Sequence, residues 1–149
     1  MSPEASKADA LRAALNAARK AQAKDRTLVL GTILANLKHR EIELKRQLTD
    51  DDVVEVLRKG IKTRRESVEQ YTGANRPELA QAERGQIAVL EEFLPAAADP
   101  EEIRTAVRAA IAGGTRDLGK VMGQVLPQFK GRVDGKDVNR IVREELQAN

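Results

Sequence analysis

The chain has 149 residues, 33% of them charged and 2% aromatic, and it contains no cysteine. This composition favours helices, because sheets draw on aromatic and β-branched residues, and it excludes disulfides, thiolate metal sites and cysteine nucleophiles. The formal net charge of +3 excludes nucleic-acid binding through bulk charge, so any such site requires local clustering of cations.

Signals for export or membrane insertion are missing from the sequence. No apolar run approaches the roughly 20 residues that a membrane helix needs. The first residues, MSPEASKADALRAAL, lack the charged, apolar and cleavage regions of a secretory signal. We therefore expect a soluble, cytoplasmic protein with no membrane partner.

The helical spacing of apolar residues predicts four helices in the N-terminal part of the chain. They run from Pro3 or Ser6 to about Ala23, from about Asp25 to at least Leu44, from Thr49 to about Gly73, and from Glu78 to Leu94. The Thr49 hydroxyl can cap the amide of Asp52 at the start of the third helix. Gly31, inside the second helix, should cost roughly 1 kcal/mol relative to alanine unless a neighbour needs the room.

The segment Leu94–Pro100 marks a boundary, because Pro95 ends a helix and Asp99-Pro100 is a good helix start. Three further helices follow, from Pro100 to about Ala112, from about Arg116 to Lys130, and from about Gly135 to Gln147. The fold class is therefore expected to be all-α. A helical N-terminal domain of about four helices (1–95) and a hinge (95–99) would precede a three-helix C-terminal domain (99–149).

Catalytic and metal-binding patterns are not recognisable. His39 is the only histidine, and no nucleophile elbow accompanies it, so we interpret it as a surface or helix-flank residue. Adjacent carboxylates such as Glu144-Glu145 diverge by about 100° on a helix, which implies neither a metal site nor an acid–base pair. Gly113-Gly114-Thr115 lacks the lysine and spacing of a phosphate loop, and a helix stop explains it better. We expect no catalytic residue, no metal and no cofactor.

The third helix carries a run of cations, Arg58, Lys59, Lys62, Arg64 and Arg65. Arg58, Lys62 and Arg65 share one face and could follow a phosphate backbone. However, glutamates at positions 55, 66 and 69 stand four residues from Lys59, Lys62 and Arg65, which favours a self-neutralised, solvated face.

Arg64 differs from its neighbours because a helical wheel places it inside the apolar stripe of the third helix. An unpaired buried charge is costly, so we expect a carboxylate of the fourth helix, Glu83 or Glu91, to hold its guanidinium. Its role would be structural.

The last helix is amphipathic, with Val138, Ile141, Val142 and Leu146 on one side and cations on the other. The candidate phosphate contacts are Lys130, Arg132, Lys136, Arg140 and Arg143. Asp134 is the candidate helix cap, a structural role. An ordinary solvated face explains the charge equally well.

Gly119 and Gly123 stand one turn apart on the preceding helix and leave a bare strip of backbone. Such a strip permits either close helix packing or the close approach of a ligand backbone. Packing is the favoured interpretation.

Three segments carry a family resemblance: KTRRESVEQY (62–71), ANRPELAQAERGQIAVLEEFLP (74–95) and DLGKVMGQVLPQFKGRVDGKDVNRIVREEL (117–146). With LANLKHREIE (34–43) and LTDDDV (48–53), they resemble the YqeY proteins of the GatB/YqeY family over nearly the whole chain. The sequence departs from the family pattern at Gly31, often an arginine, and at Gly85, more commonly a glutamate.

The resemblance implies an all-helical fold and a relation to the tail of the B subunit of glutamine-dependent aminoacyl-tRNA amidotransferase. That tail resembles Leu118–Leu146 in particular. In the amidotransferase it helps to engage tRNA, while the chemistry lies in other domains and subunits. By this resemblance the chain should not transfer amides alone, although the family often carries a carbon–nitrogen ligase label with glutamine as donor.

Our leading hypothesis is a helical module that binds tRNA, or tRNA-like RNA, by shape and phosphate contacts. The scarcity of aromatic residues argues against base stacking. A second hypothesis is a protein-interaction adaptor that docks on an amidotransferase or synthetase through the N-terminal domain. A third, a carbon–nitrogen ligase in its own right, requires a nucleotide or glutamine site that the sequence does not reveal.

Overall fold

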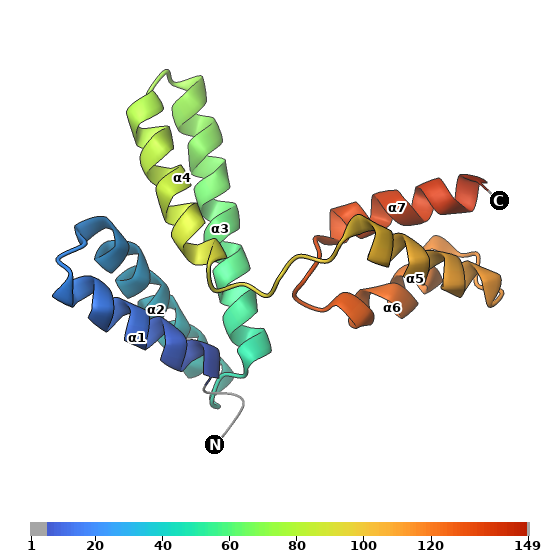
Figure 1. Cartoon of the computed structure of the whole chain (residues 1–149), viewed down its shortest axis with the longest axis horizontal. Coiled ribbons are helices and arrows are strands. Elements are labelled where there is room, and N and C mark those ends of the chain that lie inside the picture. Colours follow the sequence, from blue (N-terminus) through green and yellow to red (C-terminus); the bar gives the residue numbers. More distant parts are fainter. Residues whose placement is uncertain (1–5, 149) are drawn as a thin grey trace. The chain divides into compact units, whose positions relative to one another are not determined.

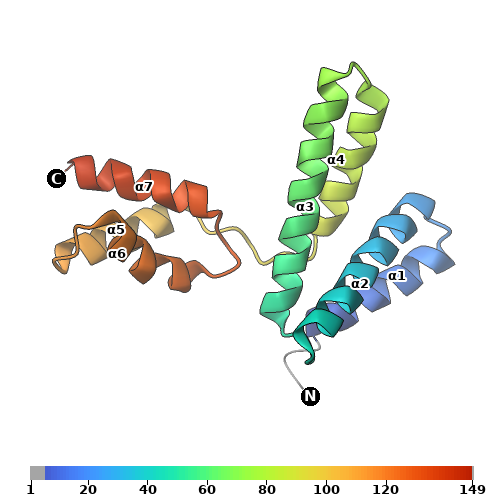
Figure 2. The same ribbon diagram turned by 180° about the vertical axis from the view of Figure 1, so that it is seen from behind.

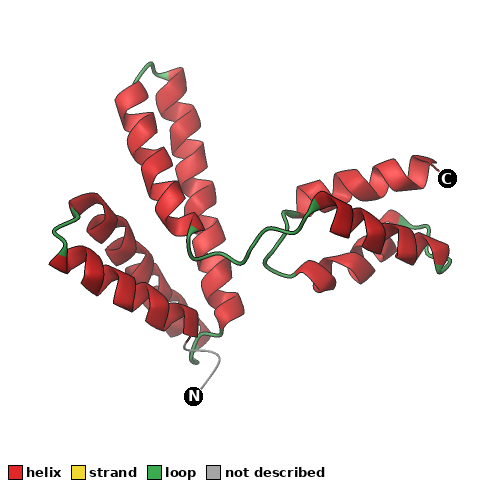
Figure 3. Ribbon diagram, in the orientation of Figure 1, coloured by secondary structure: helices red, strands yellow, loops and turns green. Residues whose placement is uncertain are grey.

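The computed structural model describes residues 6–148, and within that range every regular element is helical (Figure 3). The elements are α1 (Ser6–Lys20), α2 (Lys24–Leu44), α3 (Asp50–Gly73), α4 (Pro77–Glu91), α5 (Pro100–Ala112), α6 (Leu118–Val125), the 3-10 helix η2 (Leu126–Phe129) and α7 (Gly135–Ala148). The expected all-α fold is confirmed. Pro3, one of the two expected starts of the first helix, lies outside the described residues.

The chain divides into two compact units, Met1–Leu94 and Pro95–Asn149. Helices α1 to α4 belong to the first unit, and α5 to α7 with η2 belong to the second (Figure 1). Each unit has its own cluster of buried apolar side chains. The boundary expected at 95–99, and the hinge function of that segment, stay predictions.

The first unit consists of two antiparallel helical hairpins, α1–α2 and α3–α4 (Figures 1 and 2). Gly60 of α3 lies where α2, α3 and α4 meet. A Cβ atom there would stand 3.2 Å from Cδ1 of Ile33 and 3.5 Å from Cδ1 of Leu90. The glycine therefore allows the two hairpins to approach closely around a core that includes Leu30 and Leu57.

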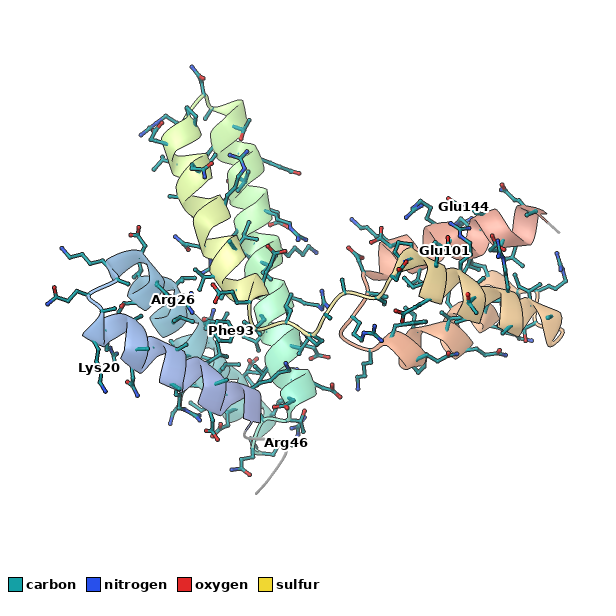
Figure 4. The ribbon with its side chains drawn as sticks, in the orientation of Figure 1. Lys20, Arg26, Arg46, Phe93, Glu101 and Glu144 are labelled. Carbon is teal, nitrogen blue, oxygen red and sulfur yellow. The ribbon has the colours of Figure 1, made fainter. Side chains whose placement is uncertain are left out.

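The capping box at the start of α3 fixes the turn between the hairpins. The Thr49 hydroxyl accepts from the Asp52 amide at 3.2 Å, and the Asp52 carboxylate accepts from the Thr49 amide at 2.8 Å. The expected cap is confirmed. Arg46 also donates to Asp52 at 2.6 Å (Arg46 is labelled in Figure 4). This hydrogen bond, with those from Thr49, holds the pKa of Asp52 well below its usual range.

In the second unit α5, α6 and α7 pack pairwise around a core that includes Val107, Val121 and Ile141. Helix α6 is shorter than the helix expected from about Arg116 to Lys130, so that prediction was wrong about its length. The α-helix ends at Val125 and continues as η2, because Pro127 has no amide hydrogen and its ring disfavours an α-helical turn.

Candidate functional site

Helix α7 places its cations opposite its buried stripe. Val138, Ile141 and Val142 are buried, whereas Lys136, Arg140 and Arg143 are exposed. The helix begins at Gly135, where the Asp134 carboxylate accepts from the backbone amide of Lys136 at 2.9 Å, as an N-cap does. The Asp134 bond thus fixes the first turn of the helix that carries the cations.

The three cations of α7 keep most of their donors available to a ligand. Arg143 Nε donates to Oδ1 of Asn139 at 2.8 Å. Arg140 makes two long ion pairs, at 3.4 Å to Glu144 and 3.9 Å to Asp137. The side chain of Lys136 has no hydrogen-bond or ion-pair partner among residues 6–148. Because a guanidinium has five N–H donors, this face can still contact several phosphate oxygens.

The acidic side of α7 is turned to α5. Glu145, only 6% exposed, accepts from Arg104 Nη1 at 2.9 Å and from Arg108 Nε at 2.6 Å. These two hydrogen bonds, Arg108's first, lower the pKa of Glu145 from its ordinary value. Arg104 also donates to Glu144 at 3.0 Å and stands 4.0 Å from Glu101; both carboxylates are labelled in Figure 4. The bonds to Glu145 neutralise a carboxylate that would otherwise weaken the positive face, whereas Glu144 also contacts Arg140 of that face at 3.4 Å.

The cluster of Arg104, Arg108 and Glu145 was not predicted from the sequence. Its signal was present, because Glu145 falls on the apolar stripe of α7 three residues after Val142. A glutamate in that position predicts a cation on the facing helix. The cluster joins α5 to α7 and has a structural role.

Arg132 is engaged inside the second unit. Its Nε donates to the Ala96 carbonyl at 3.2 Å, Nη2 reaches Glu102 at 3.4 Å, and the guanidinium lies 5.9 Å from the Phe129 ring centroid. The Ala98 amide also donates to the Arg132 carbonyl at 2.9 Å. Arg132 thus fastens the Pro95–Asp99 segment to the turn before α7. Lys130, at the end of η2, is exposed.

Gly119 and Gly123 lie on the exposed side of α6. A Cβ atom at Gly123 would meet nothing within 4 Å, and at Gly119 it would meet only Oδ2 of Asp117 at 3.4 Å. No other helix of the described part of the second unit packs on this strip, so the favoured interpretation, close packing of helices, was wrong within that unit. The alternative, close approach of a ligand backbone, remains open.

The prediction that Glu83 or Glu91 holds the Arg64 guanidinium was also wrong. Its guanidinium donates to Oε1 of Gln86 at 2.9 Å and to the Gly60 carbonyl at 3.0 Å, both neutral acceptors. Glu91 instead lies 3.8 Å from Arg65. Arg64 is only half-buried, so its guanidinium is not cut off from solvent and a carboxylate is not required. The position of Arg64 inside the α3–α4 hairpin agrees with a structural role.

The pairs expected within α3 do not form. Among the described residues, Lys59 and Lys62 have no ion-pair partner, and Arg65 turns to Glu91 of α4. The carboxylates four residues away point into solvent, where an exposed pair gains little. The prediction that these cations pair with glutamates of the same helix was therefore wrong, although the surface of α3 remains of mixed charge.

Residues 6–148 contain no group of three or more carboxylates, histidines or cysteines placed to hold a metal ion. His39 is exposed on α2, as expected. A hollow of about 360 Å³ lies between α1 and α2, with Leu34, Leu37 and Leu48 among its apolar lining and Lys38 and Glu41 among its polar lining. This hollow brings together no recognisable nucleophile and base.

The model of the family described as "Yqey-like protein" matches residues 8–146. The chain belongs to the YqeY-like family. The resemblance found in the sequence is thereby confirmed. The family model says nothing of RNA or of an amidotransferase.

Two curated relatives are similar to the chain. A protein of Pyrenophora tritici-repentis named "Altered inheritance of mitochondria protein 41, mitochondrial" is 33% identical over 107 residues, which cover 67% of this chain and 59% of that protein. An uncharacterised protein of Schizosaccharomyces pombe is 38% identical over 76 residues, covering 51% of this chain and 62% of its own length. The chain therefore spans about three fifths of each relative.

The location of the chain in the cell stays a prediction. Within the described residues, every helix is too short or too polar to cross a membrane. The name of the Pyrenophora relative places that protein in mitochondria, in contrast to the cytoplasm expected from the sequence.

Proposed function

We propose that this YqeY-like protein binds tRNA, or RNA folded like tRNA, through phosphate contacts of its second unit. Lys136, Arg140 and Arg143 supply the main charge, and Lys130 and Arg132 extend it into the preceding turn. The exposed backbone at Gly119 and Gly123 allows a phosphate chain to come close. The observation that carries the proposal is the outward cation face of α7, whose neighbour Glu145 is buried and neutralised by Arg104 and Arg108 of α5.

Charge geometry supports a nucleic-acid ligand, and the resemblance of Leu118–Leu146 to the amidotransferase tail supports tRNA among nucleic acids. Phe129, the aromatic side chain of the second unit, is buried and lies under Arg132, so the described part of that unit offers no aromatic surface for base stacking. We therefore expect recognition of RNA shape rather than of unpaired bases.

The test is binding of labelled tRNA to the full chain across a salt series. A triple variant carries Lys136→Gln, Arg140→Gln and Arg143→Gln, which removes charge without placing new acids beside Asp137 and Glu144. We expect its affinity to fall about tenfold or more, and its dependence on log salt to become less steep by about 2 to 3.

A matched control carries Arg19→Gln, Lys20→Gln and Arg84→Gln, which removes the same charge from exposed positions of the first unit. It should bind tRNA nearly as well as the parent chain. Equal losses in both variants, or no measurable binding by the parent, would refute the proposal. Thermal unfolding by circular dichroism establishes that each variant is folded.

The rival proposal is a protein adaptor that docks on an amidotransferase or synthetase through the first unit. Recovery of such a protein with the tagged chain after nuclease treatment, together with an unchanged tRNA affinity of the α7 variant, would favour the adaptor. A ligase activity of the chain itself is tested by incubation with glutamine, ATP and misacylated tRNA, and we expect no amide transfer.

A further inference from the structure

A tight turn before α7 places Arg132 over Phe129. The Arg132 amide donates to the Phe129 carbonyl at 2.8 Å. Between them, Lys130 has φ −51° and ψ 125°, and Gly131 has φ 77°. These angles are those of a type II turn, whose third residue needs a positive φ and is therefore usually glycine. The turn brings the Arg132 guanidinium to 5.9 Å from the centroid of the buried Phe129 ring.

Two further contacts hold one edge of this guanidinium. Its Nε donates to the Ala96 carbonyl at 3.2 Å, and its Nη2 donates to Glu102 at 3.4 Å. These two nitrogens lie on the same side of the planar group. The terminal edge, formed by Nη1 and the second N–H of Nη2, is left over, and Nη1 has no hydrogen-bond partner among residues 6–148. The side chain is 36% exposed, so a ligand can reach this edge.

We propose that Arg132 is a preset phosphate clamp, whose terminal edge binds two oxygens of one RNA phosphate. The proposal rests on the proposed function of the second unit and gives Arg132 a role different from that of the cations of α7. A guanidinium fork matches two phosphate oxygens, whereas an ammonium is a point charge. Because Ala96 and Phe129 already fix the guanidinium, less side-chain freedom is lost when the phosphate binds.

Arg140 is a cation of α7 that lacks such support. Its contacts are long, at 3.4 Å to Glu144 and 3.9 Å to Asp137, and 58% of its side chain is exposed. Its contribution to RNA binding should therefore depend on its charge alone. Replacement by lysine separates the two roles, because lysine keeps the charge and loses the fork.

The first measurement is the affinity of the full chain for labelled tRNA across a salt series. Arg132→Lys should lower the affinity about tenfold, because a bidentate contact is lost. The dependence on log salt should stay the same, because no charge is lost. Arg140→Lys, the matched control, should change the affinity less than about twofold.

The outcomes separate this proposal from the proposed function. Equal effects of the two lysine variants, or parent-like binding by Arg132→Lys, would refute the clamp and leave tRNA binding by charge intact. No binding by the parent chain would refute both.

A purely structural role of Arg132 gives a different result in a double-mutant cycle. Phe129→Leu keeps an apolar side chain in the core but removes the ring beside the guanidinium. For a clamp, this change should weaken tRNA binding about two- to fivefold in the parent chain and hardly at all in the Arg132→Lys chain. Additive losses would overturn the clamp. Thermal unfolding by circular dichroism establishes that each variant is folded.

The clamp also couples RNA to the Pro95–Asp99 segment. The Ala98 amide donates to the Arg132 carbonyl at 2.9 Å, beside the bond from the guanidinium to Ala96, so a phosphate on the terminal edge steadies both bonds. Hydrogen exchange of the Ala98 amide, followed by NMR, should slow about threefold or more when tRNA is added to the parent chain, and should not slow in the Arg132→Lys chain. Faster exchange with tRNA would show that phosphate displaces the segment from Arg132, which contradicts a preset clamp.

Discussion

At the scale of single residues, two glycines in the α3–α4 hairpin have opposite surroundings. A Cβ atom at Gly85 would stand in open space, whereas one at Gly60 would press on Ile33 Cδ1 at 3.2 Å. Ile33 is fully buried and cannot move aside easily. Glycine inside a helix costs about 0.5–1 kcal/mol relative to alanine. Only at Gly60 does the close contact give a structural reason for a glycine.

We therefore expect Gly85→Ala to raise the free energy of unfolding by about 0.5–1 kcal/mol. Gly60→Ala should lower it by about 1–3 kcal/mol, since overpacking outweighs the helix preference. Urea denaturation followed by circular dichroism measures both. A stabilised Gly60→Ala variant would show that α2 and α3 do not approach as closely as described.

Arg64 shows what a helical wheel can and cannot predict for one residue. The wheel correctly placed it between α3 and α4, because helical periodicity fixes the direction of a side chain. It did not identify the partner, because Gln86 and Glu91 both lie on α4 and the choice depends on how the two helices are offset. That offset is set by packing around Gly60, which single-helix reasoning does not contain.

At the scale of elements, the contact between α5 and α7 depends on the charge of Glu145. Its pKa is lower in the folded chain than the ordinary glutamate value of about 4.3, because Arg108 and Arg104 bind the ionised form. The ionised carboxylate thus stabilises the folded unit when the pH is above the ordinary pKa of glutamate. This stabilisation is lost as the pH falls through the lowered pKa.

Glu145→Gln should accordingly lower the unfolding temperature of the second unit by several degrees at pH 7. The deficit should shrink as the pH falls below about 4, where the parent chain loses the same contribution. Thermal unfolding between pH 3 and pH 7 measures it. Glu144→Gln, at an exposed partner of Arg104, is the control and should change the unfolding temperature less. A deficit that stayed constant with pH would contradict the ionic origin.

The helices themselves were predictable because caps and prolines mark their ends. Thr49 and Asp99 begin α3 and α5 where the sequence indicates. The end of α6 was missed because its apolar spacing continues past Val125 while Pro127 changes the hydrogen bonding. The surroundings of Gly119 and Gly123 could not be predicted, since the sequence does not say which face of α6 receives a neighbour.

At the scale of the whole molecule, the chain has two hydrophobic cores without a shared buried side chain. Leu57 belongs to the first, and Ile141 belongs to the second. The proline-bounded linker predicts a domain boundary at 95–99, and that boundary stays a prediction. The candidate site was predictable from the sequence only as a charge pattern on α7. The contacts of Arg132 with Ala96 and of Arg104 with Glu145 join residues more than thirty positions apart in the sequence, so helical periodicity could not predict them.

Separate cores predict separate unfolding. Leu57→Ala and Ile141→Ala should each remove about 2–5 kcal/mol from the unit that contains it, because both side chains are almost fully buried. Hydrogen exchange of the full chain, followed by mass spectrometry of peptides, assigns the loss. Amides of α1–α4 should exchange faster only in the first variant, and those of α5–α7 only in the second. Faster exchange in both units from either change would mean that they unfold as one, and the tRNA proposal would then need to include the first unit.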